Sequence, residues 1–389
     1  MIPYGRQEIT SEDISEVKKV LKSNFLTQGP FVPRFEKLVA AYCNVSNAIA
    51  VNSATSALHI ACIALGLQQD DYLWTSPNTF VASVNCARYC GANVDFVDID
   101  PNTYNMSCEV LSHKLNKAEK QGKLPKIVIP VHYSGLPCDM PKIYALSKKY
   151  GFKIIEDASH AMGASYDQYK IGSCKHSNIT VMSFHPVKII TTGEGGVALT
   201  NDNKLAEKMS ILRTHGITKD LSLMKKRAKN EIWNYQQIEL GFNYRMSDIH
   251  AALGISQMKR LDSYVKARNN IAEFYDREFS DLSVKTPFKS TRLYSSYHLY
   301  PVRIKESDML LENQKKLYEK FWKKGIAANL HYIPVHRHPY YENLGFKKGQ
   351  FPESEKFYSE TISLPIFPNL TNLQQKKVIK TLAESIKKS

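Results

Sequence analysis

The segment "VMSFHPVKIITTGEGG", residues 181–196, holds a lysine whose surroundings suit covalent chemistry. Lys188 stands among apolar residues just after a predicted strand, with two threonines and a glycine-rich run behind it. A lysine in such a place is ordinarily a solvated surface residue whose stem lies on apolar neighbours. The alternative is a desolvated amine that forms a Schiff base. Ser183, which ends the same strand, lies close enough in sequence to face the same ligand.

A second candidate group is the carboxylate in "KIIEDASHAMGA", residues 153–164. Asp157 follows a run of buried strand residues, which predicts a position at a strand tip near the middle of a sheet. A carboxylate that is half-buried there requires a cationic partner or hydrogen-bond donors. The ordinary alternative is an aspartate that caps the segment following it.

A third candidate is an anion site in "VNSATSALHI", residues 51–60. The predicted strand ends at Ser53, and Ala54, Thr55 and Ser56 open a helix. The free N–H groups and the dipole of a helix N-terminus attract anions, and small side chains allow a phosphate to approach closely. A plain serine or threonine N-cap would have the same sequence.

Together these three groups match the requirements of pyridoxal phosphate (PLP). The helix N-terminus would take the phosphate, and the aspartate would pair with the protonated pyridine nitrogen and keep the ring an electron sink. The lysine would bind the aldehyde and then move protons, because desolvation and a nearby ring cation lower its pKa.

The elements that must position these groups form a repeating pattern. From about residue 46 onward, short apolar strands alternate with segments of helical periodicity. Such βαβ alternation with nearly all-apolar strands predicts a mainly parallel sheet buried on both faces. Ligands of such sheets bind outside the carboxyl ends of the strands. The strands are predicted in the segments 48–53, 72–77, 93–100, 126–133, 152–158, 178–184 and 196–201.

The pattern changes after about residue 250. Residues 248–279 are predicted to form a long helix, either continuous or broken, followed by a strand at 295–304 and an amphipathic helix at 310–325. A lysine-rich helix ends the chain. We therefore predict a large α/β domain over residues 1–255 and a smaller α+β domain over residues 256–389.

Bulk composition excludes several classes of protein. The 389-residue chain is 43% hydrophobic and 23% charged, as is ordinary for a globular protein, and no apolar run reaches membrane-spanning length. Its start lacks the apolar core of a secretory leader, which favours a cytoplasmic protein with no membrane partner. The seven cysteines show no metal-ligand pattern, so free thiols and no metal site are expected.

The net charge of +15 is the one unusual bulk property. It is compatible with nucleic acid, an acidic membrane surface or phosphorylated small molecules as partners. No helix-turn-helix, zinc-finger or aromatic RNA-binding signature accompanies the charge, so we predict no nucleic-acid partner and a largely solvated basic surface.

Nine sequence blocks, in the same order along the chain, resemble the DegT/DnrJ/EryC1/StrS family of sugar-nucleotide aminotransferases. That resemblance implies a PLP-dependent aminotransferase of fold type I, with a large α/β domain and a smaller C-terminal α+β domain. The blocks are "LTQGPFVPRFE", "NSATSALHIA", "SPNTFVASVN", "GANVDFVDIDPNTYN", "PVHYSGLPCDM", "IIEDASHAMGA", "SFHPVKIITTGEGG", "LGFNYRMSDIHAALG" and "NLHYIPVHRHPYY".

The resemblance also implies roles around the cofactor. Lys188 matches the Schiff-base lysine, and Asp157 the carboxylate on the pyridine nitrogen. Phe80 matches an aromatic that stacks on the ring, although its type also suits a core residue, and His160 matches a position close to the cofactor, although it also suits a satisfied histidine behind the site. The phosphate-side contacts correspond to Ala54, Thr55, Ser56 and Ser183.

Further roles concern the substrate and a second subunit. Asn243 matches an asparagine that family members contribute to the neighbouring subunit's cofactor site, which implies a homodimer with active sites at the interface. A helix cap is the ordinary alternative for this residue. The sugar-nucleotide site is expected to include Tyr4, Asn24, Phe25, Leu26, Thr27, Asn329, Leu330, His331 and Tyr332.

Within the family, "MIPYGRQEIT", "SFHPVK" and "HYSGLPCDM" most resemble a branch in pseudaminic acid biosynthesis. That branch uses L-glutamate to aminate the 4-keto group of UDP-2-acetamido-2,6-dideoxy-β-L-arabino-hex-4-ulose. Enzymes of the legionaminic acid, bacillosamine and perosamine type are similar and stay open as alternatives, as does a non-catalytic regulator. Dehydratases of the same fold typically carry histidine at the lysine position, so Lys188 favours transamination.

Overall fold

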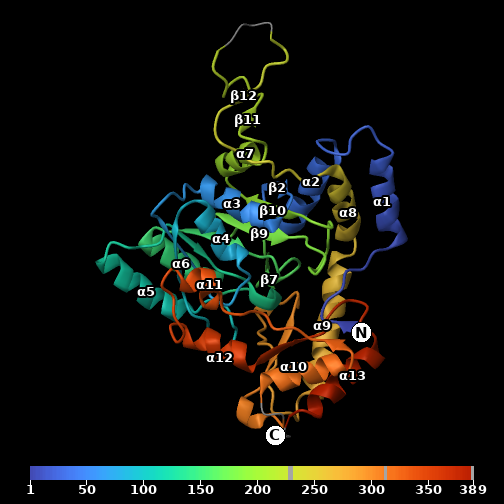
Figure 1. The fold of residues 1–389 in the computed structure, drawn as a ribbon. Helices are drawn as coiled ribbons and strands as arrows, with labels where there is room; N and C mark the ends of the chain where they lie inside the picture. The colour runs from blue at the N-terminus through green and yellow to red at the C-terminus, as the bar shows by residue number, and fades with distance from the viewer. Residues whose placement is uncertain (227–230, 311–312, 387–389) are drawn as a thin grey trace.

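A sheet of seven strands lies at the centre of the computed structural model, which describes residues 1–226, 231–310 and 313–386 (Figure 1). Its strands are short and rich in β-branched residues, as buried strands of α/β proteins are. In spatial order they are β2 (Asn47–Val51), β10 (Gly196–Thr200), β9 (Ile179–Ser183), β6 (Lys153–Asp157), β5 (Ile127–Ile129), β3 (Tyr72–Thr75) and β4 (Asn93–Phe96).

The sheet is mainly parallel, as the sequence predicts. The pairs β3–β4, β3–β5, β5–β6 and β6–β9 are parallel, whereas β10 runs antiparallel to both β9 and β2. β6 is the middle strand of the order, so its carboxyl end opens at the centre of the sheet. All seven predicted strands form, each shorter than predicted, and in most of them the ladder ends before the last predicted residues.

Helices bury both faces of the sheet. On β2, Ile49 and Val51 join the core beneath α3, α4 and α7, while Ala50 points to the opposite core beneath α2 and α8. α5 and α6 cover the rest of that opposite face. The bounds are α2 (Phe31–Cys43), α3 (Ala54–Ala64), α4 (Ala82–Tyr89), α5 (Cys108–Lys120), α6 (Met140–Tyr150) and α7 (Asn203–Leu212).

The long predicted helix is broken. α8 (Asp248–Met258) and α9 (Leu261–Glu278) are separated at Lys259 and Arg260. α9 leads away from the sheet to the C-terminal part of the chain (Figure 1). The boundary proposed between residues 255 and 256 falls inside α8 and stays a prediction.

The C-terminal part packs helices around a two-stranded antiparallel ladder, β14 with β16. The strand predicted over 295–304 is limited to β14, and the helix predicted over 310–325 is α10, with residues 311–312 outside the described residues. The elements are β14 (Tyr300–Arg303), α10 (Gln314–Lys323), β15 (Ile326–Ala327), α11 (Pro339–Glu342), α12 (Pro352–Glu360), β16 (Thr361–Leu364) and α13 (Asn372–Ala383).

Short strands complete the described fold. β11 (Ile217–Thr218) and β12 (Gln236–Gln237) belong to an arm that projects from the body (Figure 1). β7 (Ser165–Tyr166), β8 (Tyr169–Lys170) and β13 (Leu293–Tyr294) form a small sheet. In the described part of the chain, no helix has both the length and the apolar character needed to cross a membrane.

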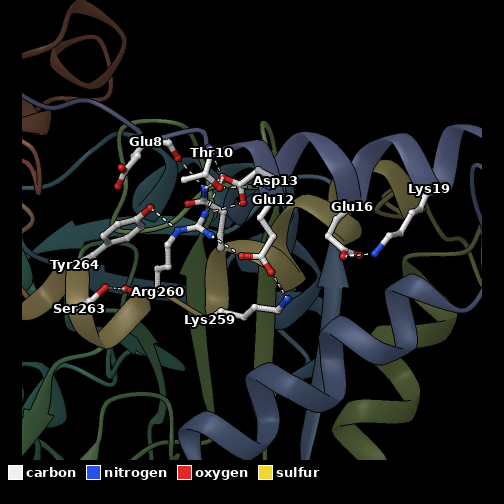
Figure 2. A network of polar contacts seen from close by, with 11 residues as sticks. Glu8, Thr10, Glu12, Asp13, Glu16, Lys19, Lys259, Arg260, Ser263 and Tyr264 are labelled. Atoms are coloured by element: carbon white, nitrogen blue, oxygen red, sulfur yellow. Dashed lines mark hydrogen bonds and ion pairs between the residues drawn. The ribbon is translucent and has the colours of Figure 1, made fainter.

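The N-terminal segment bridges distant parts of the molecule. β1 (Ile2–Pro3) pairs with β15, whereas α1 (Ser11–Leu21) packs along α8. A capping box between Thr10 and Asp13 starts α1. Figure 2 shows how the polar side chains at this helix start meet those at the α8–α9 break.

Asp13 is the centre of that polar network. Its fully buried carboxylate accepts two hydrogen bonds from Arg260 Nη2, both 2.7 Å, and one from Gln257 at 3.0 Å. Burial alone raises the pKa of Asp13, but the bonds from Arg260 and from the Thr10 N–H outweigh it, so the pKa lies below its ordinary value. Asp13 therefore stabilises the fold above its unfolded pKa, and this contribution is lost in acid as pH falls through the folded pKa.

We predict that Asp13→Ala lowers the free energy of unfolding by about 2–4 kcal/mol, because it leaves Arg260 without its main partner. Urea unfolding at neutral pH measures the change. Glu16→Ala on the same helix breaks only the ion pair with Lys19, whose side chain is 61% exposed, and should change stability by less than about 0.5 kcal/mol. Equal effects of the two substitutions would show that the buried pair has no special role.

Candidate active site

Lys188 lies in the loop that follows β9. Its backbone N–H donates to the His185 carbonyl at 2.9 Å, and Ile189 and Ile190 beside it are buried. The side chain is half-buried, and no carboxylate of the described residues lies within ion-pairing distance of Nζ. Burial lowers the pKa of Lys188 from 10.5 to about 8, while Asp157 acts in the opposite direction. A large fraction of a lysine with this pKa is a neutral, nucleophilic amine near pH 8.

Asp157 ends β6 and is 5% exposed. The Ser83 hydroxyl donates to its Oδ2 at 2.6 Å, and the Ser159 N–H donates to its Oδ1 at 3.0 Å. Oδ1 therefore caps the segment that follows Asp157, which is the ordinary role that the sequence also allowed. The other oxygen is held by a side chain of α4, so two donors orient a carboxylate that also faces the cavity described below.

The start of α3 has the features of an anion site. Ser53 is the N-cap, and its hydroxyl accepts the Ser56 N–H at 3.1 Å. The N–H groups of Ala54 and Thr55, at the first two helical positions, have no acceptor within the helix. Gly196 makes this arrangement possible, because a Cβ there would overlap the backbone of Ser53 and Ala54.

One cavity of about 440 Å³ collects most of the predicted residues. Its volume is in the range of small-molecule sites. Its walls come from the N-terminal segment, the ends of the central strands, the Lys188 loop and the C-terminal part. The predicted residues that line it are Tyr4, Ala54, Thr55, Phe80, Asp157, His160, Ser183, Lys188, Asn329, Leu330, His331 and Tyr332.

The remaining predicted residues lie outside this lining. The Ser56 hydroxyl donates to Asn52 at 2.6 Å. The run from Asn24 to Thr27 is exposed between α1 and α2, and Thr27 forms an isolated antiparallel β-bridge with Ser247. Asn243 forms a bridge with Thr214 at the base of the projecting arm, and it does not cap α8, whose N-cap is Ser247. The roles of these residues stay predictions.

Phe80 and Tyr332 form an aromatic rim. Phe80 is 57% exposed, which excludes the plain-core alternative, and its ring centroid lies 6.3 Å from that of Tyr332. The Tyr332 hydroxyl lies 3.1 Å from His160 Nε2. Aromatic faces at a cavity mouth suit a cofactor ring or a sugar.

Three histidines of the cavity are buried: His160, His298 and His331. Burial first, and then the positive charge of Lys188, lower the pKa of His331 to about 3. Burial likewise holds the pKa values of His160 and His298 well below the ordinary value. These imidazoles are therefore neutral at pH 7. Nδ1 of His160 and of His298 have no hydrogen-bond partner in the described part of the chain.

The sequence interpretation missed several lining residues. Thr79 lies in the turn before α4 and Ser83 in the first turn of that helix, and their hydroxyls are 2.9 Å apart. Because Thr79 precedes the helix, no helical spacing in the block "SPNTFVASVN" indicated that the two hydroxyls meet. The cavity is also lined by Ser159, His185, Glu194 and His298. No local sequence pattern predicted a role for these four residues.

The residues present fit PLP. The cavity combines free N–H groups at a helix start, a carboxylate held by two donors and a desolvated amine. The N–H groups would donate to the phosphate, the carboxylate would accept from the protonated pyridine nitrogen, and the amine would condense with the aldehyde of the cofactor. Within the described chain, no three His, Cys, Asp or Glu side chains group closely enough to hold a metal ion. All seven cysteines are unpaired.

A mainly parallel α/β sheet with this site defines a PLP-dependent aminotransferase of fold type I. The chain belongs to the DegT/DnrJ/EryC1/StrS aminotransferase family, whose family model matches residues 7–383.

Relatives cover nearly the whole chain. It is 40% identical to the uncharacterized protein MJ1066 of Methanocaldococcus jannaschii over 373 residues, 95% of this chain and 94% of that one. It is 37% identical to the UDP-4-amino-4,6-dideoxy-N-acetyl-beta-L-altrosamine transaminase of Campylobacter jejuni serotype O:2, with 100% and 99% coverage.

Solved structures are similar over the same extent. Helicobacter pylori PseC, an aminotransferase of pseudaminic acid biosynthesis, matches with a TM-score of 0.89 and 30% identity, covering 98% of each chain. The PMP-form of the putative sugar aminotransferase Spr1654 from Streptococcus pneumoniae matches with a TM-score of 0.89 and 28% identity, covering 99% of this chain and 98% of that one. The family and this neighbour imply that the chain uses PLP.

We predict that Lys188 of the cofactor-free protein titrates with a midpoint near pH 8, far below the value of about 10.4 for a free lysine. Acetylation with limiting acetic anhydride from pH 6 to 11, read by peptide mass mapping, measures it. Asp157→Asn should lower the midpoint further, because the carboxylate favours the charged amine. A midpoint near 10 would mean that the amine is solvated.

Proposed function

We propose that this protein transfers the amino group of L-glutamate to the 4-keto carbon of UDP-2-acetamido-2,6-dideoxy-β-L-arabino-hex-4-ulose. The products are UDP-4-amino-4,6-dideoxy-N-acetyl-β-L-altrosamine and 2-oxoglutarate, in pseudaminic acid biosynthesis. The observation that carries the transamination is the meeting of Lys188, Asp157 and the α3 N-terminus in one cavity. The similarity to the Campylobacter transaminase and to Helicobacter PseC supports this particular sugar.

The cofactor would be held by groups already oriented in the protein. The N–H groups of Ala54 and Thr55 and the Ser183 hydroxyl would bind the phosphate, and Asp157, fixed by Ser83, would bind the pyridine nitrogen. Phe80, which is exposed and lines the cavity, would stack on the ring. When bound, PLP supplies an aldehyde that condenses with amines and a ring that accepts electrons.

Lys188 would act as the base and acid of both half-reactions. An amine whose pKa is about 8 is partly neutral at physiological pH, so in the first half-reaction it can accept the α-proton of the donor substrate, and in the second it can donate a proton to the sugar carbon that receives the amino group. The imidazoles of His160, His298 and His331 are neutral, so they place no further positive charge near this amine. The Tyr332 hydroxyl and His160 Nε2, which lie 3.1 Å apart, would hold each other's side chains in place in the cavity lining.

The sugar nucleotide would lie against the outer wall. Tyr4 packs against His331, with ring centroids 5.1 Å apart, and both line the cavity with Asn329 and Leu330. Aromatic faces and amide groups suit a sugar ring and its N-acetyl group. Part of the net charge of +15 would favour the approach of a diphosphate. We place the reaction in the cytoplasm, where unpaired cysteines such as these persist.

Other nucleotide 4-keto sugars, of the legionaminic acid, bacillosamine or perosamine type, are the alternative substrates. The dehydratase alternative is disfavoured by Lys188, since relatives with that chemistry typically carry histidine there. A non-catalytic regulator is disfavoured because the lysine, the aspartate and the helix N-terminus are all present.

Turnover should require Lys188 and a matching keto sugar. Purified protein with PLP and L-glutamate is incubated with a panel of UDP- and GDP-4-keto sugars, and products are identified by mass spectrometry and NMR. We expect amination of the UDP-β-L-arabino-hex-4-ulose above all others and parallel initial-rate lines, since two half-reactions share one site.

Lys188→Ala should lower turnover at least about 10³-fold, because it removes covalent and acid–base catalysis together. Lys153→Ala, an exposed lysine on β6, is the matched control and should keep full activity. Borohydride reduction of the PLP-loaded protein should leave the cofactor on the peptide containing residue 188. Intersecting lines, or a label on another peptide, would contradict the proposal.

We further propose a homodimer in which Asn243, and the exposed run from Asn24 to Thr27, reach the partner's site. Lys188→Ala and Asn243→Ala subunits are co-expressed with different tags and assayed together. If each site takes Lys188 from one chain and Asn243 from the other, half of randomly paired dimers have one intact site, which gives about one quarter of wild-type activity. If both residues act in the same chain, no activity returns.

A further inference from the structure

Arg268 of α9 is a buried cation without an acidic partner. Its side chain is 1% exposed, and no carboxylate of the described residues pairs with it. Burial lowers the pKa of Arg268 to about 10, so the guanidinium still carries its charge at pH 7. An unpaired buried charge is costly, and it persists where backbone groups solvate it well.

The guanidinium is solvated by backbone carbonyls of two separate segments. Nη1 donates to the carbonyls of Tyr297, His298 and Ile366 at 3.1, 3.3 and 2.8 Å. Nε has no partner in the described part of the chain. All three bonds leave from one nitrogen, so they fix the two segments relative to each other across a single atom.

Both segments lead directly into the cavity. His298 lines it, and its ring centroid lies 4.3 Å from that of His160. The Ile366 N–H donates to the Tyr4 carbonyl at 2.9 Å, and Tyr4 also lines the cavity. Arg268 thus holds His298 by that residue's own carbonyl, and it reaches Tyr4 through Ile366, whose carbonyl accepts from Arg268 and whose N–H donates to Tyr4.

The two segments have no sheet partner of their own at these positions. β14 begins at Tyr300 and β16 ends at Leu364, so residues 295–298 and 365–366 lie beyond the paired ladder. Side chains of α9 supply the missing donors. Besides Arg268, Asn269 donates to the Ser295 carbonyl at 3.0 Å and Tyr275 to the Pro365 carbonyl at 3.0 Å. Buried carbonyls need such donors, and α9 provides them at the edge of the site.

We infer that Arg268 is a positioning residue for the substrate wall, holding the carbonyls of Tyr297, His298 and Ile366 so that Tyr4 and His298 face the sugar nucleotide. The inference rests on the proposed function, which assigns Tyr4 to that substrate. A lysine keeps the charge and can also donate three hydrogen bonds from one nitrogen, but its flexible stem does not pre-orient them as the rigid guanidinium does, so Arg268→Lys should loosen the two segments without removing the charge.

The test measures the two half-reactions of Arg268→Lys separately. We expect the conversion of PLP-loaded enzyme by glutamate to stay within about twofold of wild type. We expect the half-saturating concentration of the keto sugar to rise about tenfold, as the loss of one or two charge-assisted bonds predicts. Equal losses in both half-reactions, or none in either, would overturn the inference.

Matched variants separate positioning from general destabilisation. Arg303→Lys replaces an arginine of the same part of the chain, which pairs with Glu360 and touches no cavity segment, and should leave both half-reactions unchanged. Tyr4→Ala combined with Arg268→Lys should raise the sugar half-saturation by less than the product of the two single effects, because part of the Arg268 effect acts through Tyr4. Additive losses would contradict the link through Ile366.

Hydrogen exchange provides a readout that needs no substrate. In Arg268→Lys the amides of residues 297–299 and 366 should exchange faster, with α13 and the central sheet unchanged. Uniformly faster exchange would show a merely structural role. If wild type aminates no keto sugar, the proposed function fails while this measurement still tests Arg268. If the lysine variant does not fold, Arg268→Met, which fills the volume without charge, should show the same selective exchange and likewise decides the matter.

Discussion

The parallel pairing of β6 with β9 is the constraint on which the site depends. Asp157 lies opposite Val181 in this ladder, so both strands end at the same edge of the sheet. The carboxylate and the loop that carries Lys188 therefore meet there without any direct bond between them. The α3 N-terminus joins the same edge because β10, which begins at Gly196, lies between β9 and β2.

Desolvation then gives these groups their chemistry. Lys188 has no neutralising carboxylate at ion-pairing distance in the described part of the chain, so burial dominates its pKa. Asp157 is buried as well, but the donors Ser83 and Ser159 hold it. The surrounding histidines stay neutral for the same reason that the lysine is reactive. One buried environment thus produces a nucleophilic amine and an oriented carboxylate.

The outer wall depends on a different principle: backbone carbonyls that lie outside any β-ladder must find hydrogen-bond donors elsewhere. Tyr4 belongs to the N-terminal segment. This segment is held at one end by the pairing of β1 with β15 and at the other end by the hydrogen bonds of Asp13 with Arg260. The segments around His298 and Ile366 leave the β14–β16 ladder and are held by α9. The break between α8 and α9 sends α9 away from the sheet toward these segments (Figure 1). Sheet topology brings Lys188, Asp157 and the α3 N-terminus together. The outer wall, in contrast, is held by side chains that donate hydrogen bonds to backbone carbonyls.

The sequence by itself determined the alternation of strands and helices, the mainly parallel sheet and the three groups of Lys188, Asp157 and the α3 start. These follow from local periodicity and from residues at strand ends, which adjacent positions in the chain reveal. Ser83, His298 and Arg268 were invisible to that reasoning, because their importance lies in contacts with residues far away in the chain. Only the tertiary structure decided which strand ends are neighbours and which side chains reach them, because packing and burial depend on contacts that no local pattern records.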